Sequence, residues 1–145
     1  MGTALRMATR EDTEFVVQTE RETMRAYAVA TWGAWREAEA RKRAVDNLLA
    51  GRTQIIERGS VPVGILRVER TAECMNLKQI FIRPEFQRRG IGGELLRRLI
   101  DESRAARVPL RLRVLKVNPA QELYGRLGFT VAGTGPHHVY MECAP

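Results

Sequence analysis

The sequence predicts a single mixed α/β domain over residues 1–145, and three observations support this fold class. The chain is 44% hydrophobic and 28% charged, which is typical of a globular protein and excludes a disordered tail or a collagen-like repeat. Helix-like and strand-like apolar patterns alternate along it. Between Met75 and Val117, a strand, a glycine-rich loop, a helix and another strand form a crossover, which makes the two strands parallel.

The first third of the chain predicts a strand followed by two helices. Ala4 to Ala8 form a short apolar stretch, and Thr9 or Asp12 can cap the helix that follows. Gly33 marks a break, and a second helix is expected to end near Gly51. The residues that indicate this second helix lie at three- and four-residue spacings: Trp35, Ala38, Lys42, Val45 and Leu49.

From Thr53 onward, short strands predominate. Residues 53–57 and 61–68 predict a hairpin around the turn at 58–60, and a third strand is expected over 75–82. The next helix is amphipathic, with Ile91, Leu95, Leu96 and Leu99 on its apolar face. The remaining elements are a strand at 110–117, a short helix at 119–127, and strands at 129–132 and 139–142.

The apolar alternation slips by one residue in two of these strands. In the 75–82 strand, Met75 and Leu77 are apolar at odd positions, whereas Ile80 and Ile82 are apolar at even ones; the 110–117 strand slips similarly. Because side chains alternate with a period of two, a slip indicates an inserted residue or burial on both faces. We interpret the first slip as a bulge at Lys78-Gln79, which would leave backbone amides available to a ligand.

The charge distribution indicates an anionic ligand. Residues 1–50 carry eight acidic and eight basic side chains, whereas residues 51–145 carry nine and sixteen, so the whole net charge of +7 lies in the later part. Such a field attracts phosphates. No apolar run approaches the roughly 18 residues of a membrane span, and no secretory signal is evident, so a cytoplasmic protein is expected. Cys74 and Cys143 are expected to be free buried thiols.

The segment Gln87 to Gly92 is the strongest candidate for a binding site. It lies between a strand and a helix, where glycines let the backbone approach a ligand and the helix start favours negative charge. This predicts a pyrophosphate site, with a purely structural turn as the alternative. A phosphate loop ending in Gly-Lys-Ser/Thr is absent, and the dinucleotide fingerprint would need a glycine where Arg88 stands.

Two segments carry a resemblance to a known family. Gln87-Arg88-Arg89-Gly90-Ile91-Gly92 resembles the Q/R-x-x-G-x-G/A loop of the GNAT superfamily of acyl-CoA-dependent N-acetyltransferases. The segment from Asn118 to Phe129 resembles the second signature of that superfamily, ending in Leu-Tyr, a basic residue and Gly-Phe. The resemblance implies a GNAT-like fold with the order strand, two helices, three strands, helix, strand, helix and two strands, and with a splayed central parallel pair.

The resemblance also implies acetyl-CoA as cosubstrate, with no metal. Glycine amides of the loop would hold the pyrophosphate, nearby arginines would face the phosphates, and the strand end would pair with the pantetheine arm and polarise the thioester carbonyl. The implied coenzyme-binding residues are Phe81, Ile82, Gln87, Arg88, Arg89, Gly90, Ile91, Gly92, Gly93, Asn118 and Arg126.

Tyr124 is the implied general acid, because a phenol is protonated at neutral pH and can give a proton to the departing thiolate. The alternative is that its ring only packs the last helix. Two departures from the family pattern are evident: Asn118 stands two residues before Ala120 rather than three, and Gln79 stands near where many relatives carry a glutamate. A base must therefore come from elsewhere, with Glu22, Glu37 and Glu73 as candidates.

The acceptor is expected to be an amine-bearing small molecule or peptide. The first two helices would bind it through Glu22, Tyr27, Trp32 and Trp35, although both tryptophans could instead be core residues. Two other functions stay open: a basic nucleic-acid-binding domain, in view of 21 arginines, and a coenzyme-binding sensor without catalysis. The two motifs favour the enzyme, with neither nucleic acid nor membrane as partner. A homodimer is one option for the oligomeric state.

Overall fold

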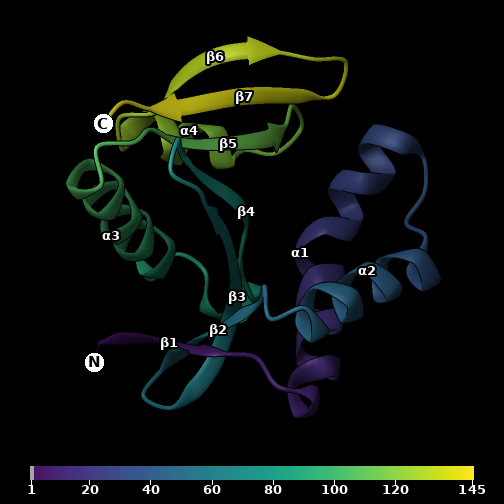
Figure 1. Cartoon of the computed structure of the whole chain (residues 1–145). Helices are drawn as coiled ribbons and strands as arrows, with labels where there is room; N and C mark the ends of the chain where they lie inside the picture. The colour runs from purple at the N-terminus through teal and green to yellow at the C-terminus, as the bar shows by residue number, and fades with distance from the viewer. Residues whose placement is uncertain (1) are drawn as a thin grey trace. The chain divides into compact units, whose positions relative to one another are not determined.

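The computed structural model describes residues 2–145, and its helices and strands follow the predicted order (Figure 1). Two short 3₁₀ helices are additional to the predicted elements. The elements are β1 (Thr3–Met7), η1 (Arg10–Asp12), α1 (Thr13–Trp32), α2 (Glu37–Leu49), β2 (Gln54–Arg58), β3 (Val61–Arg70), β4 (Met75–Ile82), η2 (Pro84–Phe86), α3 (Ile91–Ala105), β5 (Leu110–Leu115), α4 (Ala120–Arg126), β6 (Thr130–Thr134) and β7 (His138–Cys143).

The strands form a seven-stranded mixed sheet in the order β1-β2-β3-β4-β5-β7-β6. The β4–β5 pair is parallel, whereas β1–β2, β2–β3, β5–β7 and β6–β7 are antiparallel. This confirms the predicted fold class. The chain groups into two compact units: unit 1 runs up to Arg67 and resumes over Gln79–Ile91, and unit 2 consists of Val68–Lys78 and Gly92–Pro145. The single domain therefore stays a prediction.

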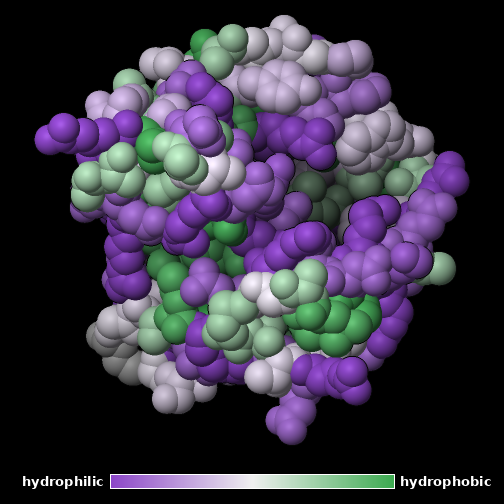
Figure 2. Space-filling view, in the orientation of Figure 1, coloured by the Kyte–Doolittle hydropathy of each residue, from purple (hydrophilic) through white to green (hydrophobic). Residues whose placement is uncertain are grey.

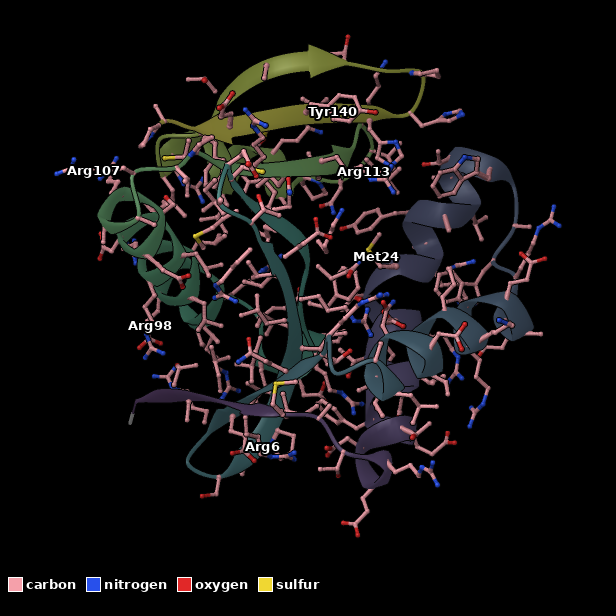
Figure 3. The ribbon with its side chains drawn as sticks, in the orientation of Figure 1. Arg6, Met24, Arg98, Arg107, Arg113 and Tyr140 are labelled. Atoms are coloured by element: carbon pink, nitrogen blue, oxygen red, sulfur yellow. The ribbon has the colours of Figure 1, made fainter. Side chains whose placement is uncertain are left out.

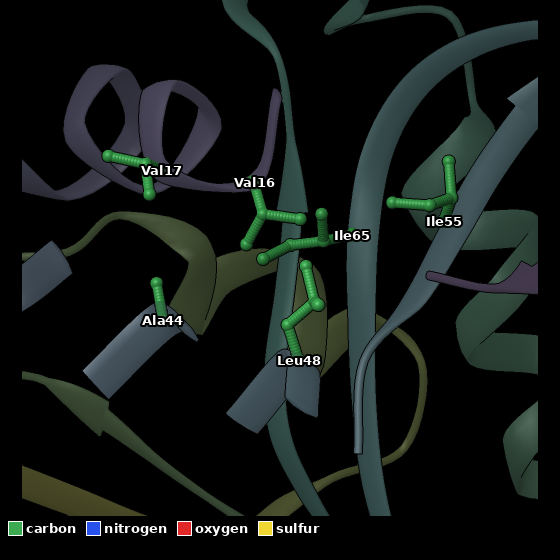
Figure 4. Packing of buried hydrophobic residues seen from close by; sticks show 6 residues of the cluster. All are labelled: Val16, Val17, Ala44, Leu48, Ile55 and Ile65. Carbon is green, nitrogen blue, oxygen red and sulfur yellow. The ribbon is translucent and has the colours of Figure 1, made fainter. Parts of the chain in front are cut away.

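In unit 1, an apolar core cluster joins α1 and α2 to β2 and β3 (Figure 4). Phe81, near the end of β4, packs against the edge of this core. The end of β4 is thereby held against the same core as α1 and α2. The core consists of Val16, Val17, Ala44, Leu48, Ile55 and Ile65, with Ala8, Phe15 and Phe81 partly buried against it.

The boundaries of α1 lie where the sequence predicts, although the Asp12 side chain forms no capping hydrogen bond with the helix. Thr9 precedes η1 and its backbone N–H donates to Asp12 at 2.7 Å, while Asp12 occupies the N-cap position of α1. Arg6 (Figure 3) donates to the same carboxylate at 2.8 Å. Gly33 ends α1 with φ +82°, a left-handed conformation that glycine adopts without strain.

The second predicted helix is present as α2, but its buried residues are not those whose spacing indicated it. Ala40, Ala44 and Leu48 are buried at four-residue spacings, whereas Leu49 is 56% exposed and Trp35 lies before the first helical residue. Ala38 and Lys42, which also belong to the predicted spacing, are exposed. The helix instead packs through small alanines, whose short side chains let its backbone approach α1 closely.

In β5 the slip in the apolar alternation corresponds to burial on both faces. Leu110, Leu112 and Val114 are buried and alternate with exposed arginines, but Leu115 is buried as well.

Cys143, in β7, is fully buried and, like Cys74, forms no disulfide. Both thiols are therefore free and buried, as expected.

In β4 the alternation of burial stops where the sequence predicted an irregularity. Met75 and Leu77 are buried, and the residues after Lys78 are all half-buried. The parallel pairing with β5 covers only Met75–Leu77. The ladder between β4 and β5 thus ends just before Lys78, while the bulge itself stays a prediction.

No helix formed by residues 2–145 is long and apolar enough to cross a membrane.

Candidate active site

The loop that joins β4 to α3 is exposed and is folded back onto the end of β4. The side-chain amide of Gln87 donates to the carbonyl oxygen of Ile82 at 2.8 Å, and its backbone N–H donates to the carbonyl oxygen of Pro84 at 3.3 Å. Gln87 thus shapes the loop with both groups. The predicted residues Phe81, Ile82 and Gln87 are brought together within unit 1.

The loop backbone has an unusual conformation. Arg88 has φ +63° and Gly90 has φ +78°, while the residue between them is not left-handed. Alternation of this kind can turn successive backbone N–H groups toward one concavity, which binds anions. A left-handed arginine costs about 1 kcal/mol or more, and such strain is concentrated at functional sites. The backbone of this loop is therefore suited to bind an anion.

The start of α3 continues this arrangement. The first N–H groups of a helix have no partner within the helix, and the helix dipole places partial positive charge there. A Cβ atom added to Gly90 or Gly92 would meet no atom within 4 Å, so the space beside both residues is open. Ile91 is buried and anchors the helix start. Arg89 lies over the ring of Phe86, with its Cζ 5.6 Å from the ring centroid.

A close approach of two strands holds the end of β4 in place. A Cβ atom on Gly64 of β3 would lie 2.2 Å from the carbonyl oxygen of Phe81, so only glycine fits at this position. The backbone N–H of Arg83 donates to the carbonyl oxygen of Val63 at 2.9 Å. The strand end that precedes the loop is thereby fixed against β3.

Sequence reasoning missed Arg83, which connects this strand end to α1. Its guanidinium contacts Glu22 at 3.1 Å and Glu85 at 3.3 Å, and its Cζ lies 5.4 Å from the centroid of the Phe15 ring. Glu22 is therefore already paired with a cation. An arginine between an apolar strand and a proline is a weak signal, because most such residues are simply solvated.

A buried polar network in unit 1 was also missed. Arg67 of β3 is only 3% exposed; its Nε donates to the Thr53 hydroxyl at 2.8 Å, and its Nη1 contacts Glu20 and lies 3.4 Å from the side-chain oxygen of Gln79. Its Nη2 has no hydrogen-bond partner among residues 2–145. The Gln79 side chain is thus oriented by a cation. The signal in the sequence is an arginine inside the apolar run of β3.

Tyr124, in unit 2, lies on α4 and is 9% exposed. Its ring centroid is 5.7 Å from that of Phe129, and the rings are tilted by 58°. Burial raises the pKa of Tyr124 to about 12, because the phenolate loses its hydration. The phenol is therefore protonated throughout the physiological range and can serve as a proton donor.

Asn118 and Arg126 lie at the two ends of α4. The side-chain oxygen of Asn118 accepts a hydrogen bond from the backbone N–H of Ala120 at 2.9 Å, and the Gln121 side chain donates to the Asn118 carbonyl oxygen at 3.1 Å. Asn118 therefore stabilises the start of the helix that carries Tyr124. Arg126 is exposed in the last turn.

The four expected acceptor residues are all in unit 1, and neither tryptophan belongs to its core cluster. Trp32 is 55% exposed, and Tyr27 and Trp35 are half-buried. The indole N–H of Trp35 donates to Glu37 at 2.5 Å. The hydrogen bond from Arg21, together with that from Trp35, lowers the pKa of Glu37 to about 2, which makes this carboxylate a poor base.

The end of α1, the connection after it and the start of α2 border a groove on unit 1. The groove is lined by Arg21, Arg25, Val29, Trp35 and Glu37.

Glu73, the third candidate base, lies on an exposed turn of unit 2, where its backbone N–H donates to the Thr71 hydroxyl at 3.3 Å. Hydrophilic residues predominate on the face of the molecule seen in Figure 2.

A model of the acetyltransferase (GNAT) domain matches residues 50–131, which are more than half of the chain and include the loop and α4. The chain belongs to the GNAT acetyltransferase family. This confirms the resemblance carried by the two motifs, and it assigns the chain to a family of acyltransferases. No curated protein sequence matches the chain.

Several solved structures have the same GNAT fold. The PaiA N-acetyltransferase of Thermoplasma acidophilum, in complex with coenzyme A, is 19% identical, with a TM-score of 0.77 and 100% of both chains covered. An acetyltransferase of Thermus thermophilus is 20% identical, with a TM-score of 0.78, covering 100% of this chain and 98% of that one. The ribosomal-protein-S18-alanine N-acetyltransferase of Escherichia coli is 22% identical, with a TM-score of 0.72 and coverages of 99% and 94%.

Proposed function

We propose that this GNAT protein transfers an acetyl group directly from acetyl-CoA to a primary amine. The observation that carries the proposal is the loop before α3, where a left-handed Arg88 and a left-handed Gly90 precede the start of a long helix. A strained, exposed, basic backbone turn at a helix start fits a pyrophosphate. The complex of a structural neighbour with coenzyme A supports this coenzyme class.

In unit 1 we assign the pyrophosphate to the backbone of the loop, chiefly the N–H of Gly90. Arg88 and Arg89 would face the coenzyme phosphates, since both side chains are exposed. The backbone of Phe81 and Ile82 would pair with the pantetheine arm and donate to the thioester oxygen, where negative charge develops during the reaction. Gln87 acts on the coenzyme indirectly, by holding the loop against Ile82.

In unit 2 we assign coenzyme contacts to Gly92 and Gly93 at the start of α3, to Arg126 and to Asn118. The side-chain oxygen of Asn118 already accepts a hydrogen bond from Ala120, so its NH₂ group is the part assigned to the coenzyme. Gly92 has open space where a side chain would stand, which lets a ligand approach its backbone.

Tyr124 is the proposed general acid. Acetyl-CoA supplies the acetyl group in activated form, as a thioester. The amine nitrogen forms the new C–N bond, the C–S bond breaks, and the phenol of Tyr124 gives its proton to the departing sulfur. The nitrogen loses one proton as it becomes an amide, and this proton restores the phenol through water. The raised pKa of Tyr124 keeps this proton in place at neutral pH.

The acceptor amine must lose a proton before it attacks, because an alkylammonium has a pKa near 10. Glu22 and Glu73 remain the proposed bases, acting through water, and Glu37 is the least suited because its pKa is about 2. We assign acceptor binding to Glu22, Tyr27, Trp32 and Trp35.

The proposal is tested with the purified full chain. Calorimetry measures acetyl-CoA binding, and thiol release measures turnover with a panel of amines. Binding followed by amine-dependent thiol release is the expected result. Coenzyme binding with no turnover on any amine would instead support a sensor, and the absence of binding would contradict the proposal as a whole.

A further inference from the structure

The groove on unit 1 combines charged and apolar side chains, and it is lined by Arg21, Arg25, Val29, Trp35 and Glu37. Three of these residues follow one another at four-residue spacings on α1, so they form one stripe along the helix. The other two come from the short connection between the helices and from the first residue of α2. The groove therefore lies along α1.

One cation of the groove is neutralised and the other is not. One carboxylate oxygen of Glu37 accepts from Arg21 at 2.9 Å, and the other accepts from the Trp35 indole at 2.5 Å. Arg25, one turn further along α1, adds to the lowering of the Glu37 pKa through its charge, but it forms no hydrogen bond or ion pair with any of residues 2–145. The groove therefore keeps one positive charge without a bonded partner, at Arg25.

The same groove offers apolar surface next to that charge. The polar edge of Trp35 is occupied by its hydrogen bond to Glu37, which fixes the ring and leaves its carbon surface for packing. Val29 lies one turn beyond Arg25 and is 48% exposed. A cation beside a fixed aromatic ring and a branched aliphatic side chain fits a ligand that combines one negative charge with an apolar group.

We infer that the acceptor carries a carboxylate next to an apolar side chain, as an amino acid or a short peptide ending in one does, and that this carboxylate binds Arg25. The inference rests on the proposed function, because it identifies the class of the acceptor. A cationic group would be repelled by Arg25 and would find Glu37 already saturated. A phosphate dianion would need a second cation to balance its charge, and the other arginine of the groove, Arg21, is already paired with Glu37.

The binding test needs no coenzyme. Phenylacetate and 2-phenylethylamine carry the same ring with opposite charges, and each is titrated into the ¹⁵N-labelled full chain. The Trp35 indole N–H signal, assigned with Trp35→Phe, reports on the groove. We expect a shift of this signal with phenylacetate and none with the amine. A shift with the amine alone, or tighter binding of phenyl phosphate than of phenylacetate, would overturn the inference.

Arg25→Gln removes the cation and keeps a shorter, neutral polar side chain, and it is expected to weaken phenylacetate binding about tenfold, as the loss of one charge-assisted hydrogen bond does. Arg43→Gln is the matched control, because Arg43 is an exposed arginine of α2 outside the groove. Unchanged affinity in Arg25→Gln, or an equal loss in the control, would contradict the assignment.

A kinetic test separates this inference from the proposed function. With acetyl-CoA, we expect Arg25→Gln to raise KM about tenfold for phenylalanine and to leave KM for phenylalaninamide, which lacks the carboxylate, unchanged. If both acceptors are acetylated with no preference for the acid, the inference fails while the proposed function holds. If no amine is acetylated, the proposed function fails, and the phenylacetate titration still decides whether the groove binds a carboxylate.

Discussion

The loop before α3 and the helix α4 present two opposite kinds of chemistry. The loop is exposed, and its proposed role depends on backbone N–H groups held in place by the left-handed conformations of Arg88 and Gly90. On α4, the proposed role depends on one side chain, Tyr124, which is 9% exposed and whose pKa burial raises to about 12. Anion binding by the loop therefore depends on its backbone conformation, whereas the acidity of the phenol depends on its burial.

The largest expected effect is that of Gly90→Val, which places a β-branched residue at φ +78°. The loop must change its conformation, and losing two charge-assisted hydrogen bonds to the pyrophosphate lowers acetyl-CoA affinity about a thousandfold. Calorimetry measures this loss.

Gly51→Val is the matched control, because Gly51 has φ +72° and similar open space in the turn after α2. Both variants should lose a similar free energy of unfolding, of about 1 kcal/mol or more. Equal loss of coenzyme binding in both would mean that the loop of Gly90 has no special role.

The next effect in size concerns the side chain on α4. Tyr124→Phe removes the proposed proton donor and keeps the ring against Phe129, so kcat should fall about a hundredfold while coenzyme affinity is retained. Tyr140→Phe is the control, since Tyr140 is 43% exposed on β7 (Figure 3). Retention of full turnover by Tyr124→Phe would leave the ring with a packing role only.

A smaller effect is expected for the charges of the loop. Arg88→Gln and Arg89→Gln should each weaken acetyl-CoA binding about tenfold or less, because their exposed side chains act through screened Coulomb attraction. The loss should shrink as the salt concentration rises. A loss of equal size at all salt concentrations would indicate that these variants disturb the backbone rather than the charge.

The smallest expected effect is on the pH dependence of stability. The folded-state pKa of Tyr124 is raised from 10.0 to about 12, so the buried phenol stabilises the fold fully below about pH 10, and this contribution is lost as the pH rises through about 12. Over this range, the free energy of unfolding of the wild type should therefore fall more steeply with pH than that of Tyr124→Phe, as thermal unfolding measures. Parallel curves for the two proteins between about pH 9 and 11.5 would contradict the raised pKa.

The sequence predicted what depends on local pattern. The order of the elements, the cap at Asp12, the end of α1 at Gly33 and the extent of β4 follow from residue types at short spacings. The loop could be predicted for the same reason, since glycines at a strand-to-helix junction reflect the backbone directly. The buried face of α2 could not, because the packing of Ala40 and Ala44 against a neighbour outweighed the larger residues.

The parts of the site that depend on long-range pairing were missed. Arg83 meets Glu22 across 61 positions of the chain, and Arg67 meets Glu20 across 47. A single sequence contains no sign of which carboxylate an arginine will reach, so Glu22 could be taken as a candidate base although Arg83 pairs with it. The proposed role of Arg25 likewise depends on the partners of Arg21 and Glu37, which the sequence alone does not show.

The amide signals of the loop report directly on whether its backbone binds the diphosphate of the coenzyme. The ¹⁵N-labelled chain is titrated with acetyl-CoA and, separately, with S-acetylpantetheine, which has the same thioester arm but no diphosphate. We predict large shifts of the Gly90 and Gly92 amide signals with acetyl-CoA and almost none with S-acetylpantetheine. Equal shifts with both compounds, or no shift with either, would contradict the binding of a diphosphate by this backbone.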